Sequence, residues 1–301
     1  MKRILLTALA VMLAAATAFA GTFSNKYNLS GFTGIKASSL FHVELSPSST
    51  FSVSIEAPDY LEQYIVAEVS HGQLVLRMKD LPNSVQRKLS DERSGVVRAD
   101  VSMPLLESVS LSGAAALNVN GAFPALRNGR FLLDMSGATH AKGLSLSAPE
   151  LQISLSGATE ADLTGDFDEV SIDISGAGKI KLNSRCPELD AELSGSARAD
   201  LKGSYREVSI EASGAARVDI ESAETLHELD IEGSGAASID TRSAKAHDVE
   251  VELSGAASCK VSAIRRISVE ATGASTCSYE AEADTRVDVI QVARGASLRK
   301  L

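Results

Sequence analysis

The side chains best suited to chemistry in this chain of 301 residues are carboxylates that recur at a nearly constant spacing. They lie 19, 19, 21 and 20 residues apart, at Asp173, Glu192, Glu211, Glu232 and Glu252. If each interval is one coil of a β-structure, neighbouring carboxylates lie about 4.8 Å apart, the distance between adjacent strands. Carboxylates this close repel each other and recruit cations. Because Ca²⁺ prefers carboxylate oxygens, the row predicts weak Ca²⁺ binding.

The same row has a second explanation that needs no ligand. A line of exposed like charges keeps a flat sheet from pairing with other sheets, and it is then a solvated surface. The Gly- and Asp-rich nonapeptide with which other β-helices bind Ca²⁺ is absent from the sequence. The sequence leaves both explanations open.

Two histidines and three cysteines are further candidates. His227 and His247 both lie eight residues before a repeated glycine, which indicates either a two-histidine transition-metal site or a surface pair. Cys259 and Cys277 both lie four residues after one, so they are expected on adjacent coils, as a disulfide or as buried apolar side chains. Cys186 lies in a connecting segment without a clear partner.

An enzymatic alternative uses residues of both signs. Some parallel β-helices cleave acidic polysaccharides with carboxylates, Ca²⁺ and a basic residue, and Asp173, Glu192, Lys179 and Arg198 supply those groups here. Each of them also obeys the repeat, whereas a catalytic site is expected to interrupt it. The motifs G-x-S-x-G and H-E-x-x-H and a phosphate-binding loop are absent from the sequence. A polysaccharide lyase or hydrolase is therefore the second hypothesis, and no catalytic residue is assigned.

A repeated Ser-Gly-Ala corner must position these side chains. Apolar and polar residues alternate on either side of each corner, which predicts strands, and a period near 19–20 residues predicts a β-solenoid. Residues four before and four after each glycine are almost all apolar, so we expect them inside, with the charged rows outside. The repeated glycines are Gly113, Gly137, Gly157, Gly176, Gly195, Gly214, Gly235, Gly255, Gly273 and Gly295.

The corner triplet itself indicates turn geometry. Glycine permits a positive φ and close packing, serine bonds neighbouring backbone, and alanine leaves room for the next coil. Three residues after the glycine, Lys179, Arg198 and Arg217 form a short basic row.

The chain divides into three predicted parts. Residues 1–20 have a basic start, an apolar run and an A-x-A site, which predict a signal peptide. Residues 21–105 lack the repeat and predict a β-rich cap, in which 41–45 and 51–55 form a hairpin-like pair and 81–95 an exposed loop. Residues 106–301 predict the solenoid.

Composition excludes some functions. Removing Lys2 and Arg3 with the leader changes the formal net charge from −10 to −12, which disfavours nucleic acid and anionic membrane surfaces. Aromatic residues make up 4% and Trp is absent, so stacking platforms for bases or sugars are scarce. The sequence has no second apolar run long enough to span a membrane, and no cofactor is expected.

Several motifs resemble a known family. The opening YNLSGFTGIKASSLFHVEL and FSVSIEA, the later GQLVLRM and VVRADVSMPLLESVSLSGAAAL, and the repeated SGA resemble the DUF2807 head GIN domain of autotransporter adhesins over roughly residues 27–300. The resemblance implies a right-handed parallel β-helix exported from a Gram-negative cell to the periplasm or the cell surface. It implies adhesin-like binding or scaffolding at the envelope, with a glycan or an envelope protein as partner, and it supplies no catalytic motif.

Overall fold

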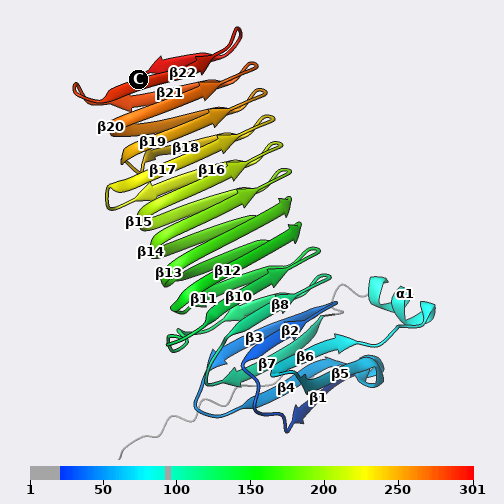
Figure 1. Ribbon diagram of the computed structural model, residues 1–301. Helices are drawn as coiled ribbons and strands as arrows, with labels where there is room; N and C mark the ends of the chain where they lie inside the picture. The colour runs from blue at the N-terminus through cyan, green and yellow to red at the C-terminus, as the bar shows by residue number, and fades with distance from the viewer. Residues whose placement is uncertain (1–20, 92–95) are drawn as a thin grey trace, which may run out of the picture.

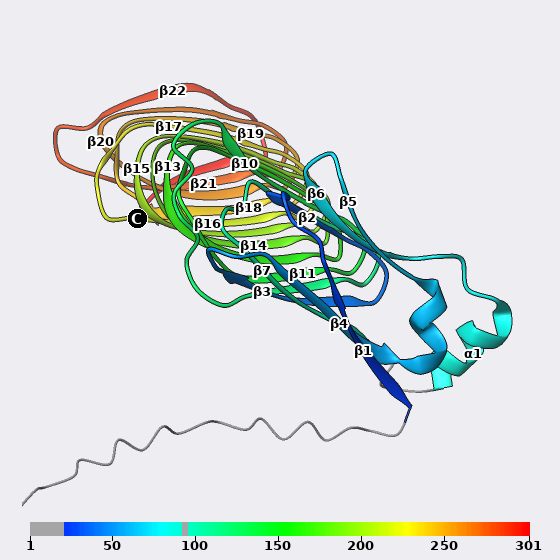
Figure 2. The ribbon, with the colours of Figure 1, turned by 90° about the horizontal axis from the view of Figure 1, so that it is seen from below.

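The structure is a computed structural model that describes residues 21–91 and 96–301. Its strands form a parallel solenoid of about ten turns over residues 108–300, preceded by an N-terminal β region (Figure 1). Seen nearly along its axis, the coils lie over one another and the N-terminal part projects to one side (Figure 2). The all-β solenoid predicted from the sequence is therefore confirmed. The predicted signal peptide, residues 1–20, lies outside the described residues.

The solenoid strands follow the alternation of the sequence. The first coils contain β8 (Ser108–Leu111), β9 (Ala116–Val119), β10 (Arg130–Met135), β11 (His140–Ser145) and β12 (Ala148–Gly157). The middle coils contain β13 (Glu160–Gly176), β14 (Lys179–Leu193), β15 (Arg198–Ala212), β16 (Arg217–Ser222) and β17 (Leu226–Gly233). The last coils contain β18 (Ser238–Ser243), β19 (Ala246–Leu253), β20 (Ser258–Ala271), β21 (Thr276–Ala281), β22 (Arg286–Val292) and β23 (Ser297–Lys300).

Apolar side chains stack inside the coils in the predicted columns. Ile153, Ile172, Ala191 and Ile210 lie four residues before successive glycines, and each is at most 2% exposed. Parallel pairing joins these residues in register from coil to coil. The outward neighbours of each inward residue are therefore also aligned in rows, because strand side chains alternate between the two faces.

The glycine corners have the predicted backbone geometry. The ten repeated glycines have φ between 67° and 100°, a region that side chains with a Cβ adopt only with strain. A Cβ added at Gly195 would lie 2.6 Å from the carbonyl oxygen of Gly176 on the preceding coil. That same oxygen accepts a hydrogen bond from the backbone N–H of Ser196 at 2.7 Å. The corner thus requires glycine both for its φ and for its close stacking.

The N-terminal part begins the stack and covers its first coil. Its elements are β1 (Thr22–Tyr27), β2 (Gly34–Ala37), β3 (Phe41–Pro47), β4 (Ser52–Pro58), the 3₁₀ helix η1 (Asp59–Tyr64), β5 (Ile65–Ser70), β6 (Gln73–Met78), α1 (Asn83–Asp91) and β7 (Val97–Met103). Strands β2 and β3 pair in parallel with β8 and β9. Parallel pairing therefore joins strands on both sides of residue 105, and the predicted domain boundary at that residue stays a prediction.

Two local predictions for this part are wrong. Strands β3 and β4 do not form a hairpin, because β7 pairs with both of them, parallel to β3 and antiparallel to β4. The segment predicted as an exposed loop contains α1, in which Val85 and Leu89 lie one turn apart and pack against the core. The helix was not predicted because two apolar residues are too few to indicate an amphipathic helix. The strand pairing was not predicted because β7 lies about 50 residues from its partners in the sequence.

The corner geometry gives a test. Replacing Gly195 with Ala adds a Cβ at φ 77°, so we expect the free energy of unfolding to fall by at least about 1–2 kcal/mol from backbone strain alone. Replacing the neighbouring exposed Ser196 with Ala is the matched control, since most other copies have Ala there. Thermal melts of the two variants measure the difference. Equal melting temperatures would contradict the assigned role of the corner.

Candidate functional site

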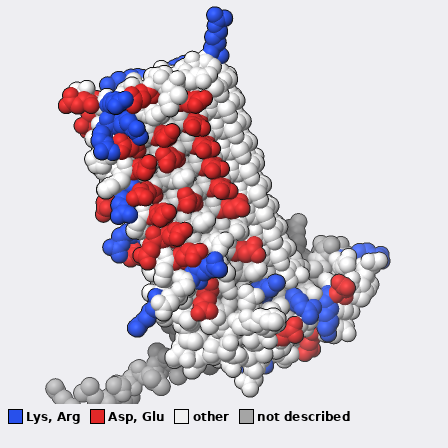
Figure 3. Space-filling model, in the orientation of Figure 1, with Lys and Arg blue, Asp and Glu red and all other residues white. Residues whose placement is uncertain are grey.

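The strands that precede the glycines present an acidic face. Pairing places the predicted carboxylates in one row, because Asp173 pairs with Glu192, Glu192 with Glu211, Glu211 with Glu232, and Glu232 with Glu252. A second acidic row runs beside it, from Glu150 through Glu169, Glu188, Glu207 and Glu228 to Asp248. Figure 3 shows these Asp and Glu side chains in rows along one long side of the molecule.

A shallow groove follows the first row along the acidic face. Its volume is about 420 Å³, and it is lined by the carboxylates of the row and by hydroxyl side chains next to the glycine corners, such as Ser194 and Ser213. The polar side chains that line it therefore all offer oxygen, beside the apolar Leu193, Ala212 and Leu253. The sequence predicted the carboxylate row of this groove and did not predict the hydroxyl row.

Charge repulsion on this face is visible at Asp230, between the two rows. Burial raises the pKa of the Asp230 carboxyl above its ordinary value of 3.8, and the nearby charges of Glu228, Glu250 and Glu232 raise it further. Arginines offset part of the charge of the second row, as Arg130 does at Glu150, Arg206 at Glu207 and Arg265 at Asp248. The middle of the acidic face keeps its negative charge.

The metal predictions are not decided by the geometry. In the described residues no three His, Cys, Asp or Glu side chains are arranged to hold a metal ion. Ca²⁺ binding at the acidic row stays a prediction. The rings of His227 and His247 lie on adjacent coils with centroids 6.1 Å apart in an edge-to-face arrangement, which matches the predicted neighbour pair.

The four residues of the enzymatic alternative are divided between two surfaces. Asp173 and Glu192 line the groove of the acidic face, which neither Lys179 nor Arg198 lines. Lys179 pairs with Arg198 and Arg198 with Arg217 on the strands that follow the glycines, so the predicted basic row is confirmed. The glycine corner separates these cations from the carboxylates, and no acid–base pair forms across it.

The cysteines are buried thiols. Cys259 and Cys277 pair across adjacent coils, both are free, and their sulfur atoms lie 3.5 Å apart. The contact with Cys277 and burial raise the pKa of the Cys259 thiol well above its ordinary value. Cys186 is also buried and donates a hydrogen bond to the backbone oxygen of Glu188 at 2.6 Å. Burial raises its pKa to about 12, so it is a poor nucleophile.

The strands that follow the glycines present a mixed-charge face, defined by the rows five and seven residues after each glycine. In register, the first row contains Asp162, Lys181, Asp200, Asp219 and Asp240. The second row contains Thr164, Asn183, Lys202 and Glu221. A groove of about 540 Å³ runs between the two rows. The sequence predictions missed it, because these positions carry both charges and neutral side chains, and only the glycine period would have aligned them.

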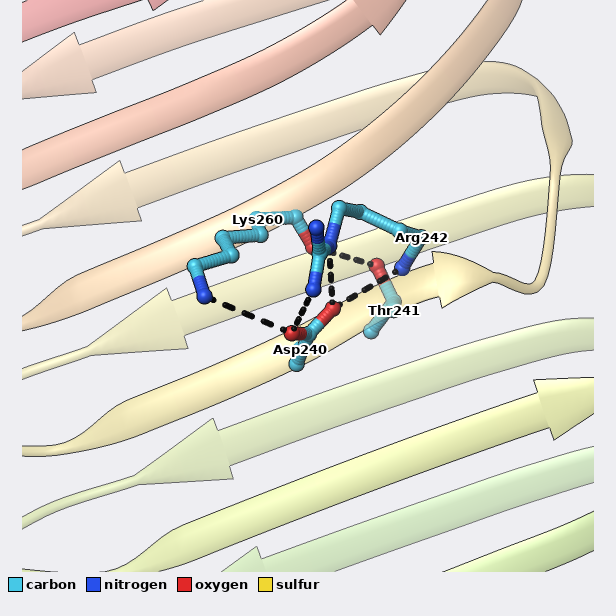
Figure 4. Close-up of polar contacts among 4 residues, drawn as sticks. All are labelled: Asp240, Thr241, Arg242 and Lys260. Carbon is cyan, nitrogen blue, oxygen red and sulfur yellow. Dashed lines mark hydrogen bonds and ion pairs between the residues drawn. The ribbon is translucent and has the colours of Figure 1, made fainter. Parts of the chain in front are cut away.

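An ion cluster lies at one end of this groove (Figure 4). Arg242 turns back onto Asp240, with its Nε 3.0 Å from Oδ1 and a terminal nitrogen 2.7 Å from Oδ2. Lys260 of the next coil lies 3.6 Å from the same carboxylate. The hydrogen bond from Arg242 is the main reason that the pKa of Asp240 is lowered below 3.8. Inside the coil, the Thr241 hydroxyl donates to the backbone oxygen of Lys260 at 3.2 Å.

Fold and surface together define the class of this protein as a parallel β-solenoid with two long, regular side-chain faces. Its family follows from a comparison with known families, in which one family model matches residues 31–227 and 185–283. The chain belongs to that family, DUF2807, described as "Putative auto-transporter adhesin, head GIN domain". No curated protein matches the chain.

Solved structures of low identity also match. A protein from Parabacteroides merdae described as a putative adhesin is 13% identical, covers 94% of this chain and 97% of its own, and has a TM-score of 0.48. Two from Parabacteroides distasonis are each 14% identical. One, described as a putative adhesin, covers 93% and 97% with a TM-score of 0.49. The other, described as a putative lipid binding protein, covers 94% and 97% with a TM-score of 0.45. Identities this low say nothing about what the chain binds.

Asp230 and Asp240, whose pKa values are shifted in opposite directions, predict opposite responses to pH. The raised pKa of Asp230 means that the folded state holds this proton more tightly than the unfolded state does. Ionisation of Asp230 therefore lowers the free energy of unfolding as the pH rises above about 3.8. The lowered pKa of Asp240 means that its stabilisation is present above 3.8 and is lost as pH falls below it. Replacing Asp230 with Asn should raise the melting temperature at pH 7, and replacing Asp240 with Asn should lower it.

Both differences should shrink as the pH falls toward 3, because Asp230 binds its proton in the folded state and the unfolded state binds a proton at Asp240 before the folded state does. Thermal melts of the wild type and the two isosteric variants between pH 3 and pH 7 measure this. Shifts of the same sign for both variants at pH 7 would refute the assignment.

Proposed function

We propose that this chain is an exported, non-catalytic binding protein that acts in the manner of an adhesin or scaffold at the cell envelope. The observation that carries the proposal is the continuous register of the acidic row from Asp173 to Glu252, which forms a long surface suited to an extended partner. The family description points the same way. The predicted leader at residues 1–20 supports export to the periplasm or to the surface of a Gram-negative cell.

A glycan or an envelope protein is the proposed partner. A formal net charge of −10 disfavours nucleic acid, since a polyanion is repelled. Among the described residues, no helix has both the length and the apolar character needed to cross a membrane. We also propose that the acidic row, from Asp173 to Glu252, binds Ca²⁺ weakly.

The experiment is a glycan-array screen of the chain from Gly21 onward, with and without Ca²⁺. We expect binding to one class of glycan. A triple variant with Glu192, Glu211 and Glu232 replaced by Gln separates the two roles of the acidic face, because it should lose any dependence on Ca²⁺ while keeping the fold. A blank array under both conditions would contradict glycan binding, and a triple variant that stays Ca²⁺-dependent would remove the metal component.

A further inference from the structure

The groove on the mixed-charge face is bounded at both ends by an irregularity in strand pairing. Before it, the pairing of β11 with β13 shifts register between Ala141 and Leu144. After it, the pairing of β16 with β18 shifts between Asp219 and Glu221, where Arg242 turns onto Asp240. Bulges of this kind end a regular row and re-aim side chains. Four coils lie between the two shifts, carrying in turn Asp162, Lys181, Asp200 and Asp219.

Some polar side chains that line the groove face solvent and make no direct contact with another side chain. Within the described part of the chain, Lys181, Asp200 and Asn183 make no side-chain hydrogen bond or ion pair, although all three line the groove. By contrast, Lys202 is paired with Glu221 at 2.7 Å, and Asp240 is paired with Arg242. Burial raises the pKa of Asp219, the charges of Asp200 and Asp240 raise it further, and Arg217 and Arg198 oppose the shift. The interior of the groove is thus open to an incoming ligand and its end is closed.

The chemistry of the groove selects among partners. Asp162, Asp200 and Asp219 repel a polyanion, and Lys181 and Lys202 repel a polycation. A peptide strand would need unpaired backbone at a sheet edge, whereas the backbone of these coils is already paired on both sides. Hydroxyl groups both donate and accept hydrogen bonds, so they can contact carboxylates, ammonium groups and amides alike.

We infer that this groove binds a neutral, linear, β-linked polysaccharide laid along the solenoid axis, with one sugar ring over each of the four coils. An extended β-linked chain advances per ring by nearly the step from coil to coil, about 4.8 Å, so each ring meets one residue of each row. A volume of about 540 Å³ lies within the range of natural ligand sites, roughly 300–1,000 Å³. The inference rests on the proposed function, because it names the face and the ligand class of that binding.

The experiment is calorimetric titration of the chain from Gly21 onward with β-1,4-linked glucose oligomers of two, four and six rings. Affinity should rise from two rings to four and level off by six, because four coils make up the groove. Replacing Asp200 with Ala removes a charged hydrogen-bond partner, which should weaken binding of the six-ring oligomer about tenfold. Replacing Asn183 with Ala should weaken it less, since that group is neutral.

Replacing Asp190 with Ala is the matched control. Asp190 lies on β14, the strand that also carries Asn183, but it is exposed on the acidic face. Its affinity should equal that of the wild type, and thermal melts should show all variants folded. The inference is overturned if no oligomer binds, if affinity keeps rising beyond four rings, or if the Asp200 variant binds as the wild type does. If the array of the preceding section still shows a ligand in that case, the proposed function stands and only this groove is excluded.

Discussion

The whole structure depends on the close stacking of left-handed glycines at one corner of every coil. The carbonyls of the eight repeated glycines from Gly113 to Gly255 accept a backbone hydrogen bond from the next coil, as Gly157 does from Ala177 at 2.8 Å and Gly195 does from Ala215 at 2.7 Å. No Cβ fits in that space without a shift, since at Gly214 it would lie 2.7 Å from the Gly195 oxygen. One fixed corner sets the register of both strands that leave it. The glycine of the corner, which has no side chain, therefore aligns the outward rows.

Alignment has an electrostatic consequence that differs between the two faces. On the acidic face identical charges meet in register, which is unfavourable between neighbouring strands. Arginines of the second row, such as Arg206 and Arg265, offset part of this repulsion. On the mixed-charge face, opposite charges alternate along part of each row, and pairs such as Lys202 with Glu221 form between coils. The acidic face thus carries rows of like charge, whereas the rows of the mixed-charge face carry both signs.

The features that recur in every coil could be predicted from the sequence, and the features that interrupt the repeat could not. The inward columns, the glycine corners, the acidic row and the adjacency of Cys259 and Cys277 all follow from one period, and the structure places them as predicted. Strand β7 between β3 and β4 was missed, because pairing between distant segments leaves no local signal. The bulge near Arg242 was missed as well, since it adds residues without changing the type of the corner. The groove that it closes could therefore be recognised only in three dimensions.

The direction of the backbone hydrogen bonds determines how such a molecule responds to tension. Bonds between coils, such as Ala256 to Gly235 and Ala274 to Gly255, run along the long axis of the stack. A pull between the two ends acts along these bonds and loads one coil interface at a time, because each coil contacts only its neighbours. Each coil that detaches releases about 65 Å of extended chain. We therefore expect a stack of this kind to yield one coil at a time under load, while the remaining coils keep their shape.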